Sequence, residues 1–280
     1  MELRKIRDGI LEWFNSTLEN PILTSFLVLV ILTVLILFLS VPYYLKDFYS
    51  YYGQVLIEAH GMLFDLLIIG ILIFWLNKNG EKRQRIRTYR DEIDDFRLWE
   101  SEEAAFRTVG NIKRLNRHGI NKINLVECFL ARTNLNYANL VGSNLNSANI
   151  SNSFLIETDL RNARLNQTNF ENSNLNQAVM SDAYASGANF KNSFLIKSDF
   201  HKAFLIKTSF KNAMLMEANL QGCYLEGTDF ENANLYKADL RKANGLTVEQ
   251  LTKAKSLYQT KFDQDILSEI QLQHPELINK

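Results

Sequence analysis

The sequence predicts a four-sided repeat solenoid that follows two membrane-spanning helices. Three observations lead to this prediction. Between residues 120 and 240 a large apolar residue returns at nearly every fifth position. Like residues on that register recur every twenty positions, as Phe170, Phe190, Phe210 and Phe230 do. Two long apolar runs with flanking clusters of basic residues precede the repeat.

The first forty residues predict an amphipathic segment and then a membrane span. Residues 1–20 combine basic residues such as Arg4 and Arg7 with apolar residues such as Trp13, a composition typical of a helix at a membrane surface. Residues 21–40 hold an uncharged apolar run that is long enough to cross a bilayer. A cleaved signal peptide is the alternative, but no small-residue cleavage site follows and the apolar run is too long.

Residues 41–54 predict an external aromatic loop, and residues 55–76 predict a second span. The loop is rich in tyrosine, which suits the lipid headgroup zone, and Lys46 is its one lysine. The second apolar run reaches Trp75, and basic residues follow abruptly from Lys78. Because both outer flanks are rich in Lys and Arg, the positive-inside rule predicts that both termini lie in the cytoplasm. We therefore expect a multi-pass protein of the inner (plasma) membrane, with the lipid bilayer as one partner.

Residues 77–118 predict a cytoplasmic helical stalk and an N-terminal cap for the repeat. Ile86, Tyr89, Ile93 and Phe96 lie at heptad spacing over about two heptads. Two interpretations are open: a short coiled coil that sets the oligomeric state, or a helix packed on its own chain. Apolar residues further along are expected to cover the open end of the first coil, since unpaired backbone groups would recruit other strands. These residues are Phe106, Val109, Ile112 and Leu115.

Residues 119–245 predict the solenoid itself. In each five-residue unit a small residue stands two positions before the central apolar residue, and Asn or Asp often lies between them. A period of five fits neither an amphipathic helix nor an alternating strand. A unit this short buries its apolar side chains only by stacking on its neighbours. Because like residues recur at twenty, we expect four units per coil, with coils about 4.8 Å apart and a rod about 30 Å long.

The repeated units resemble those of the pentapeptide-repeat family. The Ala-Asn-Leu units at 138–140 and 218–220 and the Ala-Asp-Leu unit at 238–240 carry this resemblance. It implies an all-β fold, a right-handed quadrilateral β-helix with helical caps. Members of the family range from DNA-mimicking protectors of topoisomerases to proteins with no known activity, so the resemblance specifies the fold rather than the function.

Residues 246–280 predict a C-terminal helical cap. Apolar residues return at helical spacing between Leu246 and Leu257, and Thr247 and Gln250 are placed as a capping box. The family resemblance implies such a cap as well. A stack of repeats needs terminal caps to stay soluble.

Composition argues against several classes of function. The chain carries 31 basic and 31 acidic residues, and the twelve bases and eleven acids between residues 120 and 245 nearly cancel. DNA mimicry needs a strongly acidic rod, and no basic stripe with interleaved aromatics indicates nucleic-acid binding. The four histidines lack metal-ligand spacing, and Cys128 and Cys223 occupy small inward positions as buried fillers. We therefore expect no enzymatic activity, no cofactor, no metal and no nucleic-acid partner.

Three polar residues in the second span form a candidate intramembrane site. Glu58 and Asp65 share one helical face, and His60 lies near them in the sequence. A carboxylate at the bilayer centre costs about 3 kcal/mol on an insertion scale, so such groups usually face protein or water. One hypothesis is that Asp65, helped by Glu58 and His60, lines a subunit contact or an ion path. The alternative places Glu58 and His60 at the interface and leaves Asp65 protonated or bound by Thr33.

One outer side of the predicted rod is apolar where polar residues would be usual. The twenty-residue register stacks on this side Phe154, Ile156, Phe194, Ile196, Met214, Met216 and Tyr236. Exposed apolar strips of this kind usually contact something. The strip is interpreted either as a docking or dimer face, or as a surface that the C-terminal or stalk helix covers.

These observations predict a non-enzymatic scaffold or protein-interaction module that is anchored in the membrane and presents its β-helix to the cytoplasm. A protein partner or self-association is expected. The alternative function is an oligomeric membrane effector or small channel whose two spans alter permeability.

Overall fold

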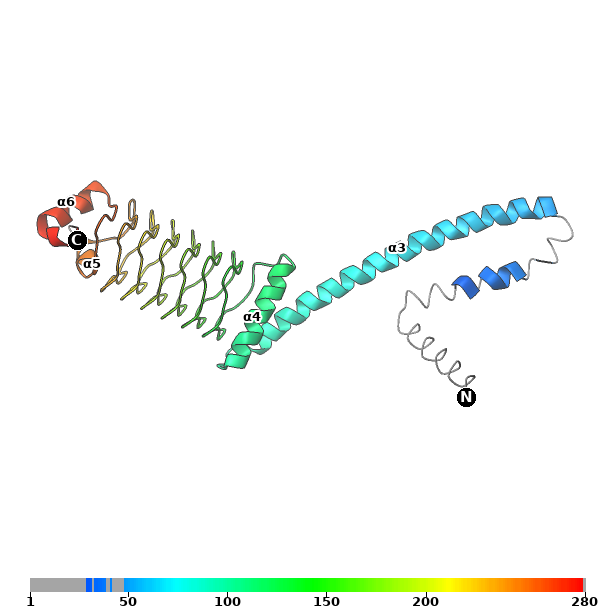
Figure 1. Ribbon diagram of the computed structural model, residues 1–280, viewed down its shortest axis with the longest axis horizontal. Helices are drawn as coiled ribbons and strands as arrows, with labels where there is room; N and C mark the ends of the chain where they lie inside the picture. The colour runs from blue at the N-terminus through cyan, green and yellow to red at the C-terminus, as the bar shows by residue number, and fades with distance from the viewer. Residues whose placement is uncertain (1–28, 32, 39–40, 42–47, 279–280) are drawn as a thin grey trace, which may run out of the picture. The chain divides into compact units, whose positions relative to one another are not determined.

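The computed structural model describes residues 29–31, 33–38, 41 and 48–278 (Figure 1). The predicted amphipathic segment 1–20 and most of the first predicted span lie outside the described residues, while a short apolar helix, Leu29–Phe38, falls within that span. The chain divides into two units, Met1–Asn79 and Gly80–Lys280.

Helix α3 (Phe48–Asp95) contains the second predicted span. It is longer than predicted at both ends, since residues 48–54 are helical rather than part of a loop, and no break separates the span from the stalk near residue 76. The helix contains no proline, and proline is the residue that most strongly interrupts a helix. In the described part of the chain, Tyr52–Asp95 is the one helix long and apolar enough to cross a membrane, judged by length and composition.

The heptad residues of α3 pack on the chain itself. Ile93 is buried, and Ile86 and Tyr89 pack against the same hydrophobic core that fills the rod. The Tyr89 ring also stacks beside His118, with ring centroids 6.2 Å apart. Of the two interpretations of this seam, the structure therefore supports a helix packed on its own chain.

Helix α4 (Glu102–Arg117) caps the N-terminal end of the rod. Its predicted capping residues Val109, Ile112 and Leu115 are buried in the core, but Phe106 is exposed, and the prediction for that residue is wrong. Phe106 lies three residues before Val109, which offsets it by about 60° around the helix, and Ala105 takes the buried place instead.

The rod is a repeat solenoid with four units per coil, as the sequence predicts. Parallel β-bridges join residues twenty positions apart, from Asn124↔Asn144 through to Tyr224↔Asn244. The prediction of an all-β class is wrong in one respect: within the described residues each unit contributes a single bridged residue, and no extended strand forms. The chain turns a corner after every unit, so two consecutive residues never extend the same ladder.

Each corner requires a backbone conformation that few residues adopt. The second residue after the central apolar one lies in the left-handed region, for example Asn152 at φ 56° and Asn212 at φ 60°. Asn and Gly tolerate this region better than other residues. Asn side chains at this corner also bond in a ladder, with Nδ2 of Asn212 donating to Oδ1 of Asn192 at 3.0 Å and Nδ2 of Asn232 donating to Oδ1 of Asn212 at 2.8 Å.

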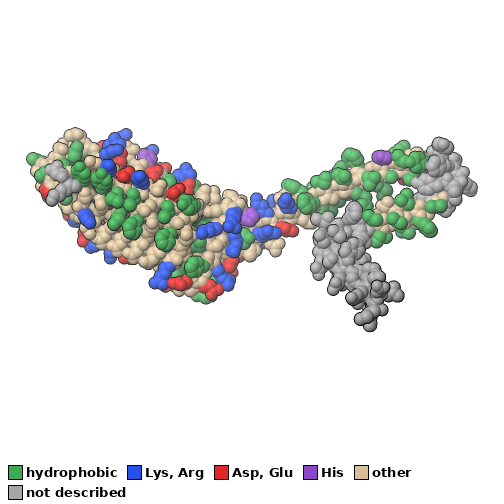
Figure 2. Space-filling model, viewed as in Figure 1, with side chains coloured by type: hydrophobic (Ala, Val, Ile, Leu, Met, Phe, Trp, Pro, Cys, Tyr) green, Lys and Arg blue, Asp and Glu red, His purple; other side chains and the backbone are tan. Residues whose placement is uncertain are grey.

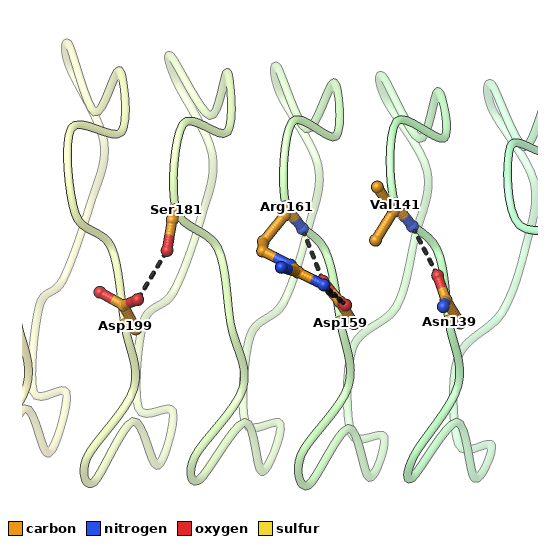
Figure 3. Close-up of polar contacts among 6 residues, drawn as sticks. All are labelled: Asn139, Val141, Asp159, Arg161, Ser181 and Asp199. Atoms are coloured by element: carbon orange, nitrogen blue, oxygen red, sulfur yellow. Dashed lines mark hydrogen bonds and ion pairs between the residues drawn. The ribbon is translucent and has the colours of Figure 1, made fainter.

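Where Asn or Asp precedes the central residue, its side chain closes the following corner. Its Oδ1 accepts a hydrogen bond from the backbone N–H two residues later, as Asn139 does from Val141 at 3.2 Å and Asp159 does from Arg161 at 3.2 Å (Figure 3). This contact is the local turn that short polar side chains favour. It explains why the repeat prefers Asn and Asp at this position.

Side chains fill the interior of the rod. The predicted phenylalanine column is confirmed, with ring centroids 4.8 Å apart for Phe170 and Phe190, 5.2 Å for Phe190 and Phe210, and 5.7 Å for Phe210 and Phe230. Phe200 comes from the opposite side and meets the rings of Phe190 and Phe210 edge-on. Among the described residues no buried side-chain nitrogen or oxygen lacks a hydrogen-bond partner.

The C-terminal cap is only partly helical. Helix α5 (Val248–Thr252) begins with the predicted capping box, in which Thr247 and Gln250 bond reciprocally. The chain then returns to the rod and adds the bridges Asn234↔Ser256 and Asp239↔Lys261, so the coil continues beyond residue 245. Helix α6 (Gln264–Gln273) and the 3-10 helix η1 (Pro275–Leu277) follow.

Candidate interaction surfaces of the repeat domain

The four sides of the rod differ in the residue that precedes the central apolar one and points outward. Following the chain around one coil, we name the sides the Tyr184 wall, the Phe190 wall, the Phe194 wall and the Asp199 wall. Phe190 is the buried central residue of its side, and the other three names are those of outward residues. The Phe194 wall presents Asn134, Phe154, Asn174, Phe194, Met214 and Asn234. The Tyr184 wall lies opposite and presents Asn124, Asn144, Arg164, Tyr184, Phe204 and Tyr224.

The Phe194 wall exposes the large apolar residues that the sequence predicts there. The exposed fractions are 53% for Phe154, 42% for Phe194 and 41% for Met214. Neighbouring coils place Phe194 and Met214 on adjacent rungs through the bridge Phe194↔Met214. No helix in the described part of the chain covers these three side chains, so the interpretation as a surface under the C-terminal or stalk helix is not supported for them.

The corner beside the Phe194 wall is also apolar. Ile156, Ile196, Met216 and Tyr236 are half-buried there. Tyr236 stacks against Tyr258 of the C-terminal segment, with ring centroids 5.7 Å apart. The corner therefore continues the apolar surface toward the C-terminal cap.

The asparagines that interrupt this apolar surface have a structural role. Phe154 and Phe194 cannot close the following corner as Asn does. The neighbouring coil supplies the missing acceptor, because Oδ1 of Asn136 accepts from the Ile156 N–H at 2.8 Å and Oδ1 of Asn176 accepts from the Ile196 N–H at 2.9 Å. The rod thus accommodates Phe154 and Phe194 on this wall without leaving the N–H of the following corner unbonded.

A second aromatic row lies on the Tyr184 wall, and the sequence analysis missed it. The rings of Tyr184 and Phe204 stack at 4.9 Å with 3° between their planes, and those of Phe204 and Tyr224 stack at 4.6 Å with 1° between their planes. The signal was present in the sequence as aromatic residues at 184, 204 and 224, at the same spacing of twenty that identified the buried column.

The candidate intramembrane residues do not converge. Glu58, His60 and Asp65 are all exposed on α3. Glu58 and Asp65 lie on one face about 10 Å apart along the axis, whereas helical geometry turns His60 about 200° away from Glu58. His60 Nδ1 lies 2.6 Å from the Leu56 carbonyl oxygen of its own helix. The hypothesis that His60 assists Asp65 is not supported by this arrangement.

Several ion pairs lie on the remaining rod surface. On the Asp199 wall, the Arg241 guanidinium hydrogen-bonds the Asp239 carboxylate at 2.6 Å and lowers the pKa of Asp239 below its ordinary value. Between coils, Lys211 bonds Glu231 at 2.7 Å. These pairs are exposed and neutralise one another, which is consistent with a structural role.

Neither cysteine is placed for chemistry. Both thiols are buried, and burial raises the pKa of Cys128 to about 11 and that of Cys223 to about 12. The Cys223 thiol donates a hydrogen bond to the Phe200 carbonyl oxygen at 2.8 Å. In the part of the chain that the structure describes, no three His, Cys, Asp or Glu residues are grouped so as to hold a metal.

Comparison with known families matches this geometry. The family described as pentapeptide repeats matches residues 122–152, 153–192, 178–215 and 213–244, with eight copies. Residues 122–244 thus carry pentapeptide repeats.

Solved structures of pentapeptide-repeat proteins are similar to part of the chain. HetL, a protein involved in heterocyst differentiation regulation from the cyanobacterium Nostoc sp. strain PCC 7120, is 24% identical with a TM-score of 0.27, and the match covers 48% of this chain and 62% of HetL. Full-length QnrB1, a plasmid-mediated fluoroquinolone resistance protein, is 15% identical with a TM-score of 0.33, covering 54% and 86%. A protein of the Arabidopsis thaliana thylakoid lumen is 21% identical with a TM-score of 0.24, covering 46% and 75%. No curated protein matches the chain.

Proposed function

We propose that this protein is a non-enzymatic, membrane-anchored interaction module whose repeat domain holds a protein partner, or a second copy of the chain, against the Phe194 wall. The observation that carries the proposal is the exposure of Phe154, Phe194 and Met214 in one row. Exposed apolar patches often mark sites of protein–protein contact. Covering the exposed halves of three large side chains contributes about 3 kcal/mol, so an occupant would also need the half-buried corner beside them.

Membrane attachment is the second part of the proposal. Nearly all apolar residues of α3 between Tyr52 and Trp75 are exposed in the single chain, as lipid-facing side chains would be. Basic residues from Lys78 onward favour a cytoplasmic repeat domain. With a first span at 21–40, both termini lie in the cytoplasm. Alkaline carbonate extraction is expected to leave the protein in the membrane pellet, and its release into the supernatant would contradict the anchor.

A photo-crosslinking amino acid tests the docking face. Placed at Phe194 in the full-length protein within membranes, it is expected to give crosslinked adducts. Ser209 is the matched control, because it holds the same position in its unit on the Phe190 wall, where the surface is polar. Adducts of twice the chain mass identify a second copy, and other masses identify a different protein. Absence of adducts from position 194, or equal adducts from both positions, would contradict the proposal.

A second function, an oligomeric effector or small channel, is favoured by one observation. Glu58 and Asp65 share a face of an apolar helix and bond to no basic group in the described residues. Carboxylates inside a bilayer usually face protein or water, which oligomerisation would provide. Asp65→Leu in reconstituted vesicles tests this function: ion flux and oligomeric state should both change, and if both are unchanged the channel hypothesis fails.

A further inference from the structure

A basic cleft lies where the C-terminal part of α3 adjoins the Tyr184 wall. Its volume is about 1050 Å³, and both sides belong to the unit Gly80–Lys280. Arg90 reaches it from α3 and Arg97 from the turn just after α3, while Lys122 and Arg164 reach it from the coils. Figure 2 shows Lys and Arg side chains gathered where α3 and α4 adjoin the rod. Among the described residues that line the cleft, Asp94 is the only acid.

Three of the four cations are unpaired. Arg97 bonds the Asp94 carboxylate and also donates to the Val126 carbonyl oxygen at 2.5 Å, which fastens α3 to the first coil. Arg90, Lys122 and Arg164 take part in no ion pair with any described residue. Elsewhere on the rod, basic residues of the corners commonly pair with acids of the same wall or the next coil. The cleft therefore concentrates about three uncompensated positive charges on a rigid frame.

An aromatic ring closes one end of this cationic group. Tyr184 lines the cleft and is the N-terminal end of the stack formed with Phe204 and Tyr224. The preceding residue on the same wall is Arg164, bridged to Tyr184 through the backbone. Within the described chain, no ring or cation stacks on the second face of Tyr184. A planar group placed there would extend the stack beside the cations.

We propose that this cleft binds a nucleotide with two or more phosphates. Arg90, Lys122 and Arg164 bind the phosphates, since guanidinium and ammonium groups make strong charge-assisted bonds to phosphate oxygens. The base stacks on Tyr184. A nucleoside diphosphate carries a charge of about −3 at neutral pH, because a terminal phosphate is close to doubly ionised there, and this charge balances the three free cations. The site is on the wall opposite Phe194, so it is independent of the proposed function.

Calorimetric titration of the full-length protein in neutral detergent tests the site with ADP, inorganic pyrophosphate and adenosine as probes. We expect ADP to bind about ten-fold more tightly than pyrophosphate, because base–aromatic stacking accounts for a difference of this order. Adenosine should bind much more weakly than either. Arg164→Gln is expected to weaken ADP and pyrophosphate about ten-fold each. Tyr184→Ala is expected to weaken ADP alone, to the level of pyrophosphate.

Two matched control variants separate the site from general effects. Tyr224 is the other end of the same ring stack and lies outside the cleft, so Tyr224→Ala should leave ADP binding unchanged. Lys207 is an exposed cation of a corner of the rod, also outside the cleft, and Lys207→Gln should have no effect. Circular dichroism of each variant verifies that the rod is folded.

Several outcomes would overturn the proposal. No measurable binding of ADP and pyrophosphate would do so, as would binding that Arg164→Gln leaves unchanged while Lys122→Gln also has no effect. Equal affinities for ADP and pyrophosphate, insensitive to Tyr184→Ala, would exclude recognition of a base. Repeating the titration with added phosphatidylglycerol separates a free nucleotide from a lipid headgroup: loss of ADP binding would assign the cations to lipid instead.

Discussion

Truncation of Phe210 tests whether ring stacking, in addition to burial, holds the coils together. Phe210 is fully buried and touches three rings: Phe190 at 5.2 Å, Phe230 at 5.7 Å and the edge of Phe200 at 5.6 Å. Phe170 is equally buried in the same column but touches one ring, that of Phe190, at 4.8 Å. The two residues differ mainly in the number of aromatic partners.

The difference sets the expected magnitude. Replacing a buried phenylalanine by alanine costs about 3–5 kcal/mol. Each aromatic pair contributes about 0.5–1.5 kcal/mol beyond its buried area. Phe210→Ala loses two more pairs than Phe170→Ala, so we expect it to lower the free energy of unfolding by about 1–3 kcal/mol more. Urea unfolding of the full-length protein in detergent, followed by far-ultraviolet circular dichroism, measures the difference.

Position along the rod needs its own control, because repeat stacks do not unfold uniformly. Leu175 and Leu215 occupy the next wall directly after Phe170 and Phe210, and both are fully buried. Hydrogen exchange of the backbone amides in the two coils concerned, measured in Leu175→Ala and in Leu215→Ala, gives the loss of stability that depends on position alone. If the excess cost of Phe210→Ala over Phe170→Ala does not exceed the corresponding excess for the leucines, ring stacking is not the cause.

Three further predictions concern the corners and the titrating groups. Burial raises the pKa of Cys128 to about 11 and of Cys223 to about 12, from 9.0. The unfolded thiols therefore ionise first, and stability falls as pH rises from 9 toward 11, by about 1.4 kcal/mol per pH unit for each thiol. Alkaline melting curves of Cys128→Ala/Cys223→Ala should lack this loss. Arg241 lowers the pKa of Asp239 in the folded state below 3.8, the value of the unfolded chain. The ionised Asp239 therefore stabilises the fold above pH 3.8, and this stabilisation is lost as pH falls through the lowered pKa. The melting temperature should therefore fall less steeply with decreasing pH in Asp239→Asn than in the unchanged protein. An equally steep fall would exclude this contribution. At Asn212, which has φ 60°, we expect the alanine substitution to cost about 1 kcal/mol more than the glycine substitution, because alanine is strained in that region. Urea unfolding of the two variants compares them, and equal costs would show that the left-handed conformation is not the source.

Much of the solenoid could be predicted because its register repeats the same environment many times. The central apolar residue and the small residue two positions before it recur so regularly that the inward positions follow from the sequence alone. The column from Phe170 to Phe230 and the capping box of Thr247 and Gln250 were predicted in this way and are confirmed.

Other features could not be predicted because the local sequence fits two different structures equally well. The heptad residues Ile86 and Ile93 suit a coiled coil as well as packing on the chain's own rod, and only the tertiary contacts show the second arrangement. Phe106 is as apolar as its neighbours, yet the rotation of α4 exposes it. Residues 48–54 suit a headgroup loop by composition, but nothing in them stops a helix.

By itself, the sequence determined the five-residue unit, the four units of each coil and the apolar row that includes Phe194. Each of these features follows from side chains of one kind that recur at a fixed spacing along the chain. Only the tertiary structure decided which apolar surfaces remain exposed and how Arg90, from a helix, comes to share a cleft with Arg164 and Tyr184, from the rod. The physical reason is that a repeat encodes contacts between neighbouring coils, whereas the docking of α3 depends on contacts such as that of Arg97 with Val126, which occur once and leave no periodic signal.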